Sequence, residues 1–207
     1  MAEESGVKCF DTFTGFKFMA EKKNQLEEAG EGKVIFSYEE SYGYMVGDYV
    51  RDKDAVTASM LLTEMVMWYA ERDMTLFDAA QEIFGKFGRY LEKTVNLYMH
   101  GLDGLENMKK LMSCLRENPP REIAGTAVSE VRDYLAGVSR TKGGEEKLEL
   151  FGSNVLKYIL DDGTAVVVRP SGTEPKIKVY ILTRGENEAD CIGKVERFSG
   201  WAERLGE

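Results

Sequence analysis

Hydrophobic and polar positions in the first part of the chain follow helical periods, interrupted by one short apolar run. Residues 16–29 predict a helix that two glycines end, and residues 54–72 predict a longer helix with a repeat near 3.6 residues. A Ser/Thr-x-x-Asp/Glu motif at 75–78 predicts the start of another helix through about residue 87. The run at 33–38 is short and apolar, so we expect a buried strand there.

These elements predict a partial α/β domain over residues 1–87. Residues 39–52 have no clear period and are expected to form a loop, which leaves the strand at 33–38 without a partner. The methionine-rich stretch 60–67 is expected to pack in a core. Since an unpaired strand exposes a sheet edge, the pattern also predicts self-association, for example as a homodimer through this partial domain.

The pattern in the second part changes to the two-residue alternation of strands. Two strong strand signals are joined by a three-residue turn in which a glycine suits a left-handed position. The polar segment 139–149 is expected to be an exposed loop. Strands are expected at 90–99, 126–135, 155–160, 164–169 and 177–183, and helices at 105–116 and 187–205. For residues 126–135 a helix is a close alternative. The predicted fold class is therefore an α/β partial domain (1–87) followed by an α+β domain (88–207) with an antiparallel sheet backed by two helices.

Composition narrows the classes of partner and compartment. The chain has 207 residues and a formal net charge of −9 at pH 7, which argues against nucleic acid or an anionic membrane surface as the main partner. It shows neither an apolar run long enough to cross a membrane nor a secretory signal pattern. Three widely spaced cysteines do not form a disulfide framework, so we expect reduced thiols and a cytoplasmic location.

The segment Arg169 to Lys178, RPSGTEPKIK, lies between two predicted strands and carries phosphate-binding chemistry. Arg169 offers a planar fork of donors, Ser171 and Thr173 offer hydroxyls, and Gly172 allows close approach of the backbone to a ligand. Two lysines add positive charge nearby, and successive backbone N–H groups in such a turn can bind an anion. A surface hairpin turn is the alternative, while a P-loop is excluded because Gly-Lys-Ser/Thr is absent.

The segment 36–54, FSYEESYGYMVGDYVRDKD, carries chemistry suited to a sugar. Glu39 follows a predicted strand and can accept two hydroxyl donors, and Ser41 adds a polar contact. Arg51 and Lys53 add positive charge a dozen residues later. Adjacent carboxylates at 39 and 40 are poorly placed for a glycosidase pair, and the EF-hand spacing is not met. A solvated loop that ends in a helix cap remains an equal alternative.

These motifs resemble those of the α-D-phosphohexomutases, the phosphoglucomutase and phosphomannomutase family. RPSGTEPKIKVY resembles the phosphate-binding loop of the family's fourth domain, and FSYEESYGYMVGDYVRDKDAV the sugar-specificity loop of its third. TGFKF resembles a family segment just upstream, and the three motifs follow one another in the family order. The flanking residues favour glucose, whereas the loop EESYG is compatible with glucose or mannose.

The resemblance implies a C-terminal portion of an enzyme that interconverts hexose 1-phosphates and 6-phosphates. By motif position, Glu39 and Ser41 would bind sugar hydroxyls, with Lys53 and Arg51 near the phosphosugar. Arg169, Ser171, Gly172 and Thr173 would hold the phosphate that is not transferred. The full-length family enzyme would use Mg²⁺ and a hexose bisphosphate activator, neither of them a cofactor of this chain.

The chain departs from the family because it contains neither the phosphoserine loop nor the Asp-x-Asp-x-Asp metal loop. We therefore expect no catalytic residue and no metal ligand here, missing N-terminal mutase domains, and inactivity in isolation. One alternative is a natural short sugar-phosphate-binding module, or a subunit completed by a partner chain. An independent hydrolase that uses Glu39 or Glu40 is a third hypothesis.

Overall fold

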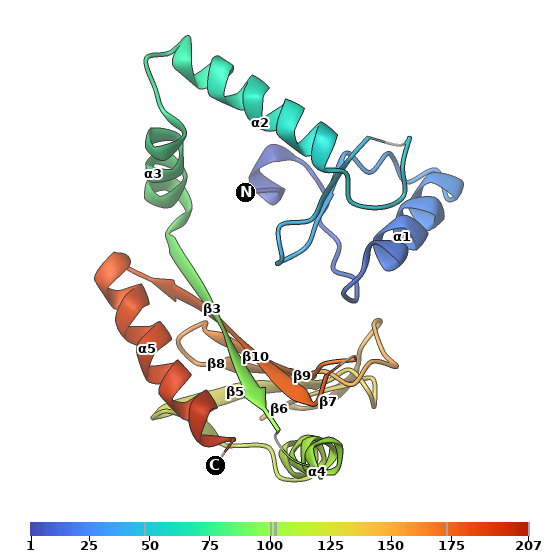
Figure 1. The fold of residues 1–207 in the computed structure, drawn as a ribbon, viewed down its shortest axis with the longest axis vertical. Helices are drawn as coiled ribbons and strands as arrows, with labels where there is room; N and C mark the ends of the chain where they lie inside the picture. Colours follow the sequence, from blue (N-terminus) through green and yellow to red (C-terminus); the bar gives the residue numbers. More distant parts are fainter. Residues whose placement is uncertain (48, 100, 102, 173, 207) are drawn as a thin grey trace. The chain divides into compact units, whose positions relative to one another are not determined.

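Residues Met1–Ile83 and Phe84–Glu207 form two separate units in the computed structural model of the chain, which describes residues 1–47, 49–99, 101, 103–172 and 174–206 (Figure 1). The first unit contains a short 3₁₀ helix and most of the helical residues predicted for the first part of the chain. Its elements are η1 (Glu3–Ser5), α1 (Phe16–Glu28), β1 (Phe36–Tyr38), β2 (Tyr44–Val46) and α2 (Ala55–Ala70), and α3 (Leu76–Phe87) continues into the second unit.

Helix α1 forms where the sequence predicts it, because its apolar positions recur on one face. Phe16, Ala20 and Leu26 are buried on that face. Lys23 is buried on the same face with 1% of its surface exposed, and its ammonium pairs with Glu27 one turn further on. The capping motif that precedes α3 is also formed, since the Asp78 amide donates to the Thr75 hydroxyl (3.2 Å) and the Thr75 amide to the Asp78 carboxylate (2.8 Å).

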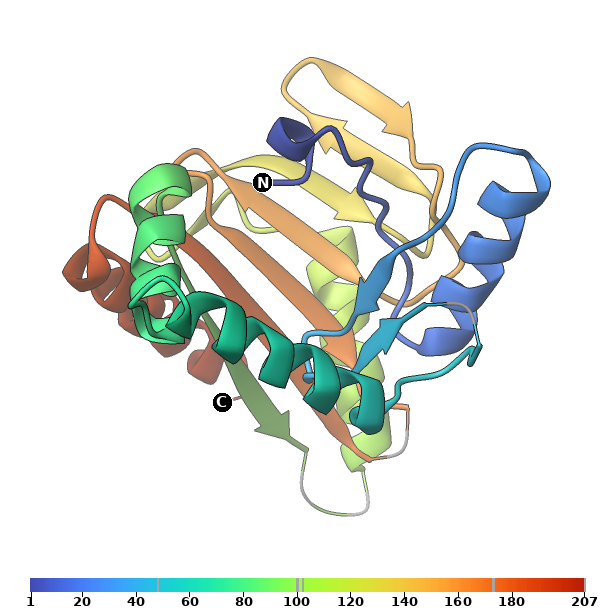
Figure 2. The ribbon, with the colours of Figure 1, turned by 90° about the horizontal axis from the view of Figure 1, so that it is seen from above.

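The predicted buried strand at 33–38 is wrong in extent and in burial. Strand β1 covers only Phe36–Tyr38, Phe36 is 42% exposed and Ile35 is 64% exposed. The expectation of a missing partner is also wrong, because β1 pairs with β2 in an antiparallel hairpin whose register sets Ser37 opposite Met45 (Figure 2). The predicted loop 39–52 thus contains the strand β2. The sequence does not indicate it because the strand is only three residues long and has a glycine on each side.

Helix α2 has the predicted position, and the expected core packing of its methionines is wrong. No residue of α2 is buried, and its exposed apolar side chains include Met60 (59%), Met67 (62%) and Trp68 (50%). A helix that is apolar on all sides is normally covered in the native assembly. The sequence pattern reports that apolar character and does not show whether the covering element belongs to the same 207 residues.

The second unit is the predicted antiparallel sheet with helices on one face. The strands are ordered β3-β10-β9-β8-β5-β6-β7, with β4 paired to β5 beside this path. Its elements are β3 (Arg89–Tyr98), α4 (Gly104–Glu117), β4 (Glu122–Ile123), β5 (Thr126–Asp133), β6 (Val138–Thr141), β7 (Gly144–Lys147), β8 (Leu156–Leu160), β9 (Ala165–Pro170), β10 (Lys176–Gly185) and α5 (Glu188–Arg204).

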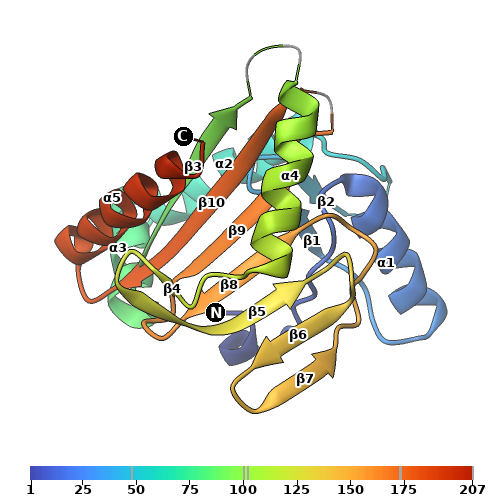
Figure 3. The ribbon, with the colours of Figure 1, turned by 90° about the horizontal axis from the view of Figure 1, so that it is seen from below.

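Helices α4 and α5 cover the same face of this sheet (Figure 3). Alternate residues of the central strands point into the core beneath them, which is why Val166, Val168, Ile177, Val179 and Ile181 are all fully buried. Their neighbours in sequence point to the opposite face, which neither α4 nor α5 covers.

One further expectation for this unit is wrong. The polar segment 139–149 is not a loop, because it contains most of β6 and all of β7, paired from Val138 opposite Lys147 to Thr141 opposite Gly144. This hairpin forms the edge of the sheet, where both faces of a strand can be polar, so the two-residue alternation of hydrophobicity is absent.

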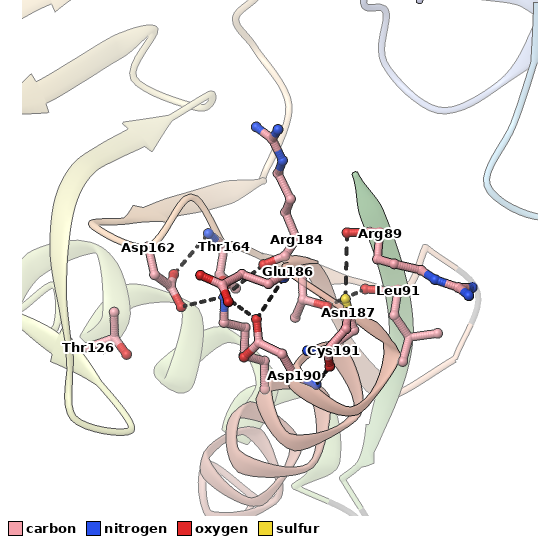
Figure 4. Close-up of polar contacts among 12 residues, drawn as sticks. Arg89, Leu91, Thr126, Asp162, Thr164, Arg184, Glu186, Asn187, Asp190 and Cys191 are labelled. Carbon is pink, nitrogen blue, oxygen red and sulfur yellow. Dashed lines mark hydrogen bonds and ion pairs between the residues drawn. The ribbon is translucent and has the colours of Figure 1, made fainter. Parts of the chain in front are cut away.

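Polar contacts anchor the first turns of α5 to the sheet (Figure 4). The Asn187 side chain caps the helix by accepting a hydrogen bond from the Asp190 amide (3.0 Å). Lys194 donates to the Arg184 carbonyl (2.7 Å) and lies 3.8 Å from the Asp162 carboxylate in the β8–β9 turn. These contacts lie at the opposite end of β9 and β10 from the segment Ser171–Pro175, and so help to hold the central strands in register.

No helix in the described part of the chain is long and apolar enough to cross a bilayer.

Candidate functional site

The segment that connects β9 to β10 is a closed turn at the end of the central strands. The Ser171 amide donates to the Lys176 carbonyl (2.8 Å), and the Lys176 amide donates to the Glu174 carbonyl (2.8 Å). The Met99 amide, just after β3, donates to the Pro175 carbonyl (2.8 Å) and ties the turn to the neighbouring strand. The two ends of this connection are therefore bonded to each other, and Pro175 is bonded to the end of β3.

Two cations stand side by side where β9 enters this turn. The register of the sheet sets Arg169 directly opposite Lys178, on the face that α4 and α5 leave uncovered. Like charges directly opposite each other on two strands destabilise a sheet. Neither side chain forms an ion pair within the described residues, so this pair concentrates positive charge in a chain whose net charge is −9. An anion between them would relieve that repulsion.

Lys176 contributes less charge than its position suggests. Its ammonium lies 2.6 Å from the Glu174 carboxylate and 5.4 Å from the centre of the Tyr98 ring. The hydrogen bond that the ammonium donates to Glu174 raises the pKa of Lys176, with burial opposing it to a smaller extent. The positive charge available at the turn therefore comes mainly from Arg169 and Lys178.

Gly172 lies at an open point of the turn. A Cβ atom built on it would meet no heavy atom within 4 Å, and its φ is outside the left-handed region. Folding of the chain thus gives no reason for glycine here, whereas close approach of a ligand would. Thr173, the second hydroxyl of the predicted phosphate set, lies outside the described residues.

The predicted sugar-binding residues lie around the β1–β2 turn of the first unit. The Glu39 amide donates to the Gly43 carbonyl (2.9 Å), and the Ser41 hydroxyl lies 3.4 Å from the Glu39 carboxylate. A Cβ atom built on Gly43 would lie 3.0 Å from the Glu39 Oε2 atom and 3.2 Å from the Lys53 Cδ atom. Glu39 and Lys53 therefore flank the same point, and glycine there leaves room for both.

The chain returns to this turn because the start of α2 is bound to β2. The Asp54 amide donates to the Tyr44 carbonyl (2.9 Å), and the Asp54 carboxylate caps α2 by accepting from the Val56 amide (3.0 Å). A hydrogen bond from the Tyr49 hydroxyl lowers the pKa of Asp54 to about 2, with a smaller contribution from Thr57. The carboxylate thus stays ionised and holds the cap beside Lys53.

Arg51 is directed elsewhere. Its guanidinium donates to the Asn24 side chain on α1. The structure therefore groups Glu39, Ser41 and Lys53 around one turn and gives Arg51 a contact with a neighbouring helix.

Among the described residues, no three His, Cys, Asp or Glu side chains are grouped so that they could hold a metal ion. We assign no step to a metal in this chain.

Two residues of β10 that contact or face Arg169 are absent from the predicted set of phosphate ligands. Lys178 lies opposite Arg169, and the Tyr180 hydroxyl accepts a hydrogen bond from the Arg169 guanidinium (3.2 Å). The alternation Lys176, Lys178, Tyr180 against Ile177 and Val179 places these three on one face, a signal present in the sequence. Which strand lies beside them is the part that only the fold shows.

Two models of one protein family match the chain. The model described as phosphoglucomutase/phosphomannomutase, alpha/beta/alpha domain III, matches residues 1–87. The model described as phosphoglucomutase/phosphomannomutase, C-terminal domain, matches residues 112–191.

Curated relatives with similar sequences are phosphoglucomutases of Staphylococcus aureus. One is 36% identical over 200 residues, which are 94% of this chain and 35% of that protein. The phosphoglucomutase of another strain is 35% identical over the same length. The chain therefore spans about a third of the length of the curated relatives it matches.

A solved structure shows the same fold. The exocytosis-sensitive phosphoprotein parafusin, described as a phosphoglucomutase from Paramecium in its open form, superposes with a TM-score of 0.61 and 18% sequence identity. The match covers 100% of this chain and 36% of that one.

Proposed function

Because this chain belongs to the phosphoglucomutase/phosphomannomutase family, as a C-terminal part of it, we propose that it binds a hexose phosphate. In this proposal residues 88–207 hold the phosphate that is not transferred, and residues 1–87 bind sugar hydroxyls. The reaction served would be the interconversion of hexose 1-phosphate and 6-phosphate in the cytoplasm.

The observation that carries the proposal is the pairing of Arg169 with Lys178 across β9 and β10, beside a turn in which Gly172 has open space around it. In the proposed complex Arg169 donates through its planar fork to two phosphate oxygens, and Lys178 supplies a point charge. Ser171, Gly172 and Thr173 contribute hydroxyl and backbone N–H donors. Such a site anchors and orients one end of the ligand, and positioning is a large part of what phosphoryl transfer requires.

Titration of the 207-residue chain with inorganic phosphate and with glucose 6-phosphate, followed by NMR, tests the phosphate site. Replacing Arg169 by alanine removes a charge-assisted contact and should weaken binding of both ligands by about tenfold to a hundredfold. Arg140→Ala is the matched control, since Arg140 lies on β6, next to the edge strand β7, and is paired with Glu145 (2.8 Å). Equal affinities of the wild-type chain and Arg169→Ala would contradict the proposal.

The sugar part of the proposal rests on the grouping of Glu39, Ser41 and Lys53 around Gly43. Arg51 is a weaker member, because its guanidinium already has an acceptor in Asn24. Glu39→Gln should lower the affinity for glucose 6-phosphate and leave that for inorganic phosphate unchanged. Glu40→Gln, one residue away in the same turn, is the control for a general change in charge.

We further propose that this chain has no mutase activity in isolation. The phosphoserine loop and the Asp-x-Asp-x-Asp loop that the family resemblance implies are absent from its sequence, so phosphoryl donor and metal would come from elsewhere. A coupled assay with glucose 1-phosphate, Mg²⁺ and a hexose bisphosphate activator should show no turnover. Turnover by the pure chain that Arg169→Ala abolishes would overturn this part.

A further inference from the structure

The Arg169 guanidinium has a hydrogen-bond acceptor inside the protein, although it is a proposed ligand for phosphate. Its Nη2 atom lies 3.2 Å from the Tyr180 hydroxyl, and its Cζ atom lies 5.9 Å from the centre of the Tyr180 ring. Within the described residues Tyr180 is the only hydrogen-bond partner of this side chain, since the buried Nε atom of Arg169 has none.

The sheet fixes this contact. Arg169 is set opposite Lys178, and Tyr180 is set opposite Val167, so Arg169 and Tyr180 are diagonal neighbours on the same face of β9 and β10. Diagonal neighbours are within reach of long and aromatic side chains. Both strands are inner members of the sheet, so the backbone that carries both residues is paired on each side.

The contact uses one donor of a group that has five. The hydroxyl accepts from Nη2, which has a second hydrogen, and Nη1 has two more. An arginine side chain loses much rotational freedom when it binds an anion, and holding it in advance reduces that loss. The contact holds the guanidinium over the face of β9 and β10 that also carries Lys178, which lies directly opposite Arg169.

We propose that Tyr180 is a positioning residue, whose hydroxyl holds the Arg169 guanidinium in the orientation that accepts a phosphate. The inference rests on the proposed function, because it assigns Arg169 to the same phosphate. It adds a residue whose role is exerted through Arg169 and not through contact with the ligand.

Tyr180→Phe isolates the hydroxyl, because the ring and its contact with the guanidinium remain. The 207-residue chain and this variant are compared in two measurements. The first is ¹⁵N relaxation of the buried Arg169 Nε–H group without ligand. The second is titration with inorganic phosphate. We expect faster motion of the guanidinium and phosphate binding weaker by about threefold to tenfold, the loss of one modest hydrogen bond.

Two further variants separate positioning from other roles. Tyr90→Phe is the matched control, since Tyr90 lies opposite Arg184 on the same sheet with the Arg184 Cζ atom 5.7 Å from its ring. It should change neither measurement. In the Arg169→Lys background, which lacks the planar fork, Tyr180→Phe should have no additional effect on phosphate binding.

The outcomes distinguish the inference from the proposed function. If the wild-type chain binds phosphate and Tyr180→Phe binds it equally well, the inference is wrong and the phosphate site remains. If Tyr180→Phe still weakens binding in the Arg169→Lys background, Tyr180 contacts the phosphate itself and the positioning role is wrong. If the wild-type chain does not bind phosphate, the proposed function fails and the inference fails with it, whatever the relaxation data show.

Discussion

At the scale of single residues, two glycines near the two ends of β9 show different uses of the same residue type. Gly163 lies in the turn before β9 with a φ of +79°, where a Cβ is unfavourable whatever the surroundings. Gly172 lies in the turn after β9, outside the left-handed region and with no heavy atom within 4 Å of a built Cβ. The first glycine serves folding, and the second is free to serve a ligand.

Gly172→Ala should therefore fold like the wild-type chain and bind phosphate more weakly. The affinity should fall by about tenfold if the added Cβ moves the ligand away and one hydrogen bond is lost. Gly163→Ala should do the reverse, with a loss of about 1–2 kcal/mol in the free energy of unfolding from the left-handed backbone. Thermal unfolding and phosphate titration of both variants provide the measurement. A Gly172→Ala variant with unchanged affinity would show that the ligand does not approach this backbone.

A second residue-scale prediction concerns Asp54. Hydrogen bonds, chiefly from Tyr49, lower the pKa of its carboxyl from 3.8 to about 2, so the charged form is favoured in the folded chain. Its contribution to stability is complete above the unfolded pKa and is lost as the pH falls from about 4 towards 2. In ¹³C NMR titrations, Tyr49→Phe should raise the pKa of Asp54 towards 3.8, whereas Tyr42→Phe should not.

At the scale of elements, α2 is an apolar helix whose side chains are not buried. It buries no residue, and only one of its sixteen residues, Glu64, carries a charge. Helix α4, by contrast, buries Met108, Met112 and Leu115 against the sheet of its own unit. An exposed apolar face of this kind is a site of association.

We predict that the isolated chain self-associates through α2, for example as a homodimer. The double variant Met60→Lys, Met67→Lys should shift sedimentation and light scattering towards the monomer, because both side chains are about 60% exposed and their loss leaves no cavity. Leu105→Lys on α4, which is 59% exposed in the other unit, is the control and should leave the distribution unchanged. A wild-type chain that is monomeric at all concentrations would refute the prediction.

At the scale of the whole molecule, the two units differ in how much apolar surface they bury. The second unit has one continuous core from Val95 to Ala202, with both helices packed on a sheet. The buried apolar side chains of the first unit are few, chiefly Phe16, Leu26 and Met45. Because burial of apolar area dominates stability, the second unit should be the more stable one.

The two tryptophans report on the two units separately. Trp68 lies on α2 in the first unit, and Trp201 packs against the core of the second. In urea, the variant Trp201→Phe should report an earlier unfolding transition than Trp68→Phe, at a midpoint lower by about 1 M or more. Coincident midpoints would mean that the units unfold as one.

Sequence alone determined much of the second unit. The alternation in β8, β9 and β10 and the glycine turn between the first two are local preferences, and they formed where predicted. The caps of α2 and α3 also formed where predicted. The chemistry of the turn at 169–178 was also visible, since residue types and spacing are local properties. The hairpin of β6 and the edge strand β7 was missed because a hairpin that is polar on both faces has no hydrophobic period.

Only the tertiary structure decided which residues are neighbours. The pairing of Arg169 with Lys178, the diagonal contact with Tyr180 and the grouping of Glu39 with Lys53 around Gly43 depend on register and on chain reversal over many residues. Register follows from the packing of one face of the sheet against its helices, a balance of contacts that no single segment contains. The burial of α2 was wrong for the same reason: an apolar stripe shows the need for a partner, and only the fold shows whether one is present.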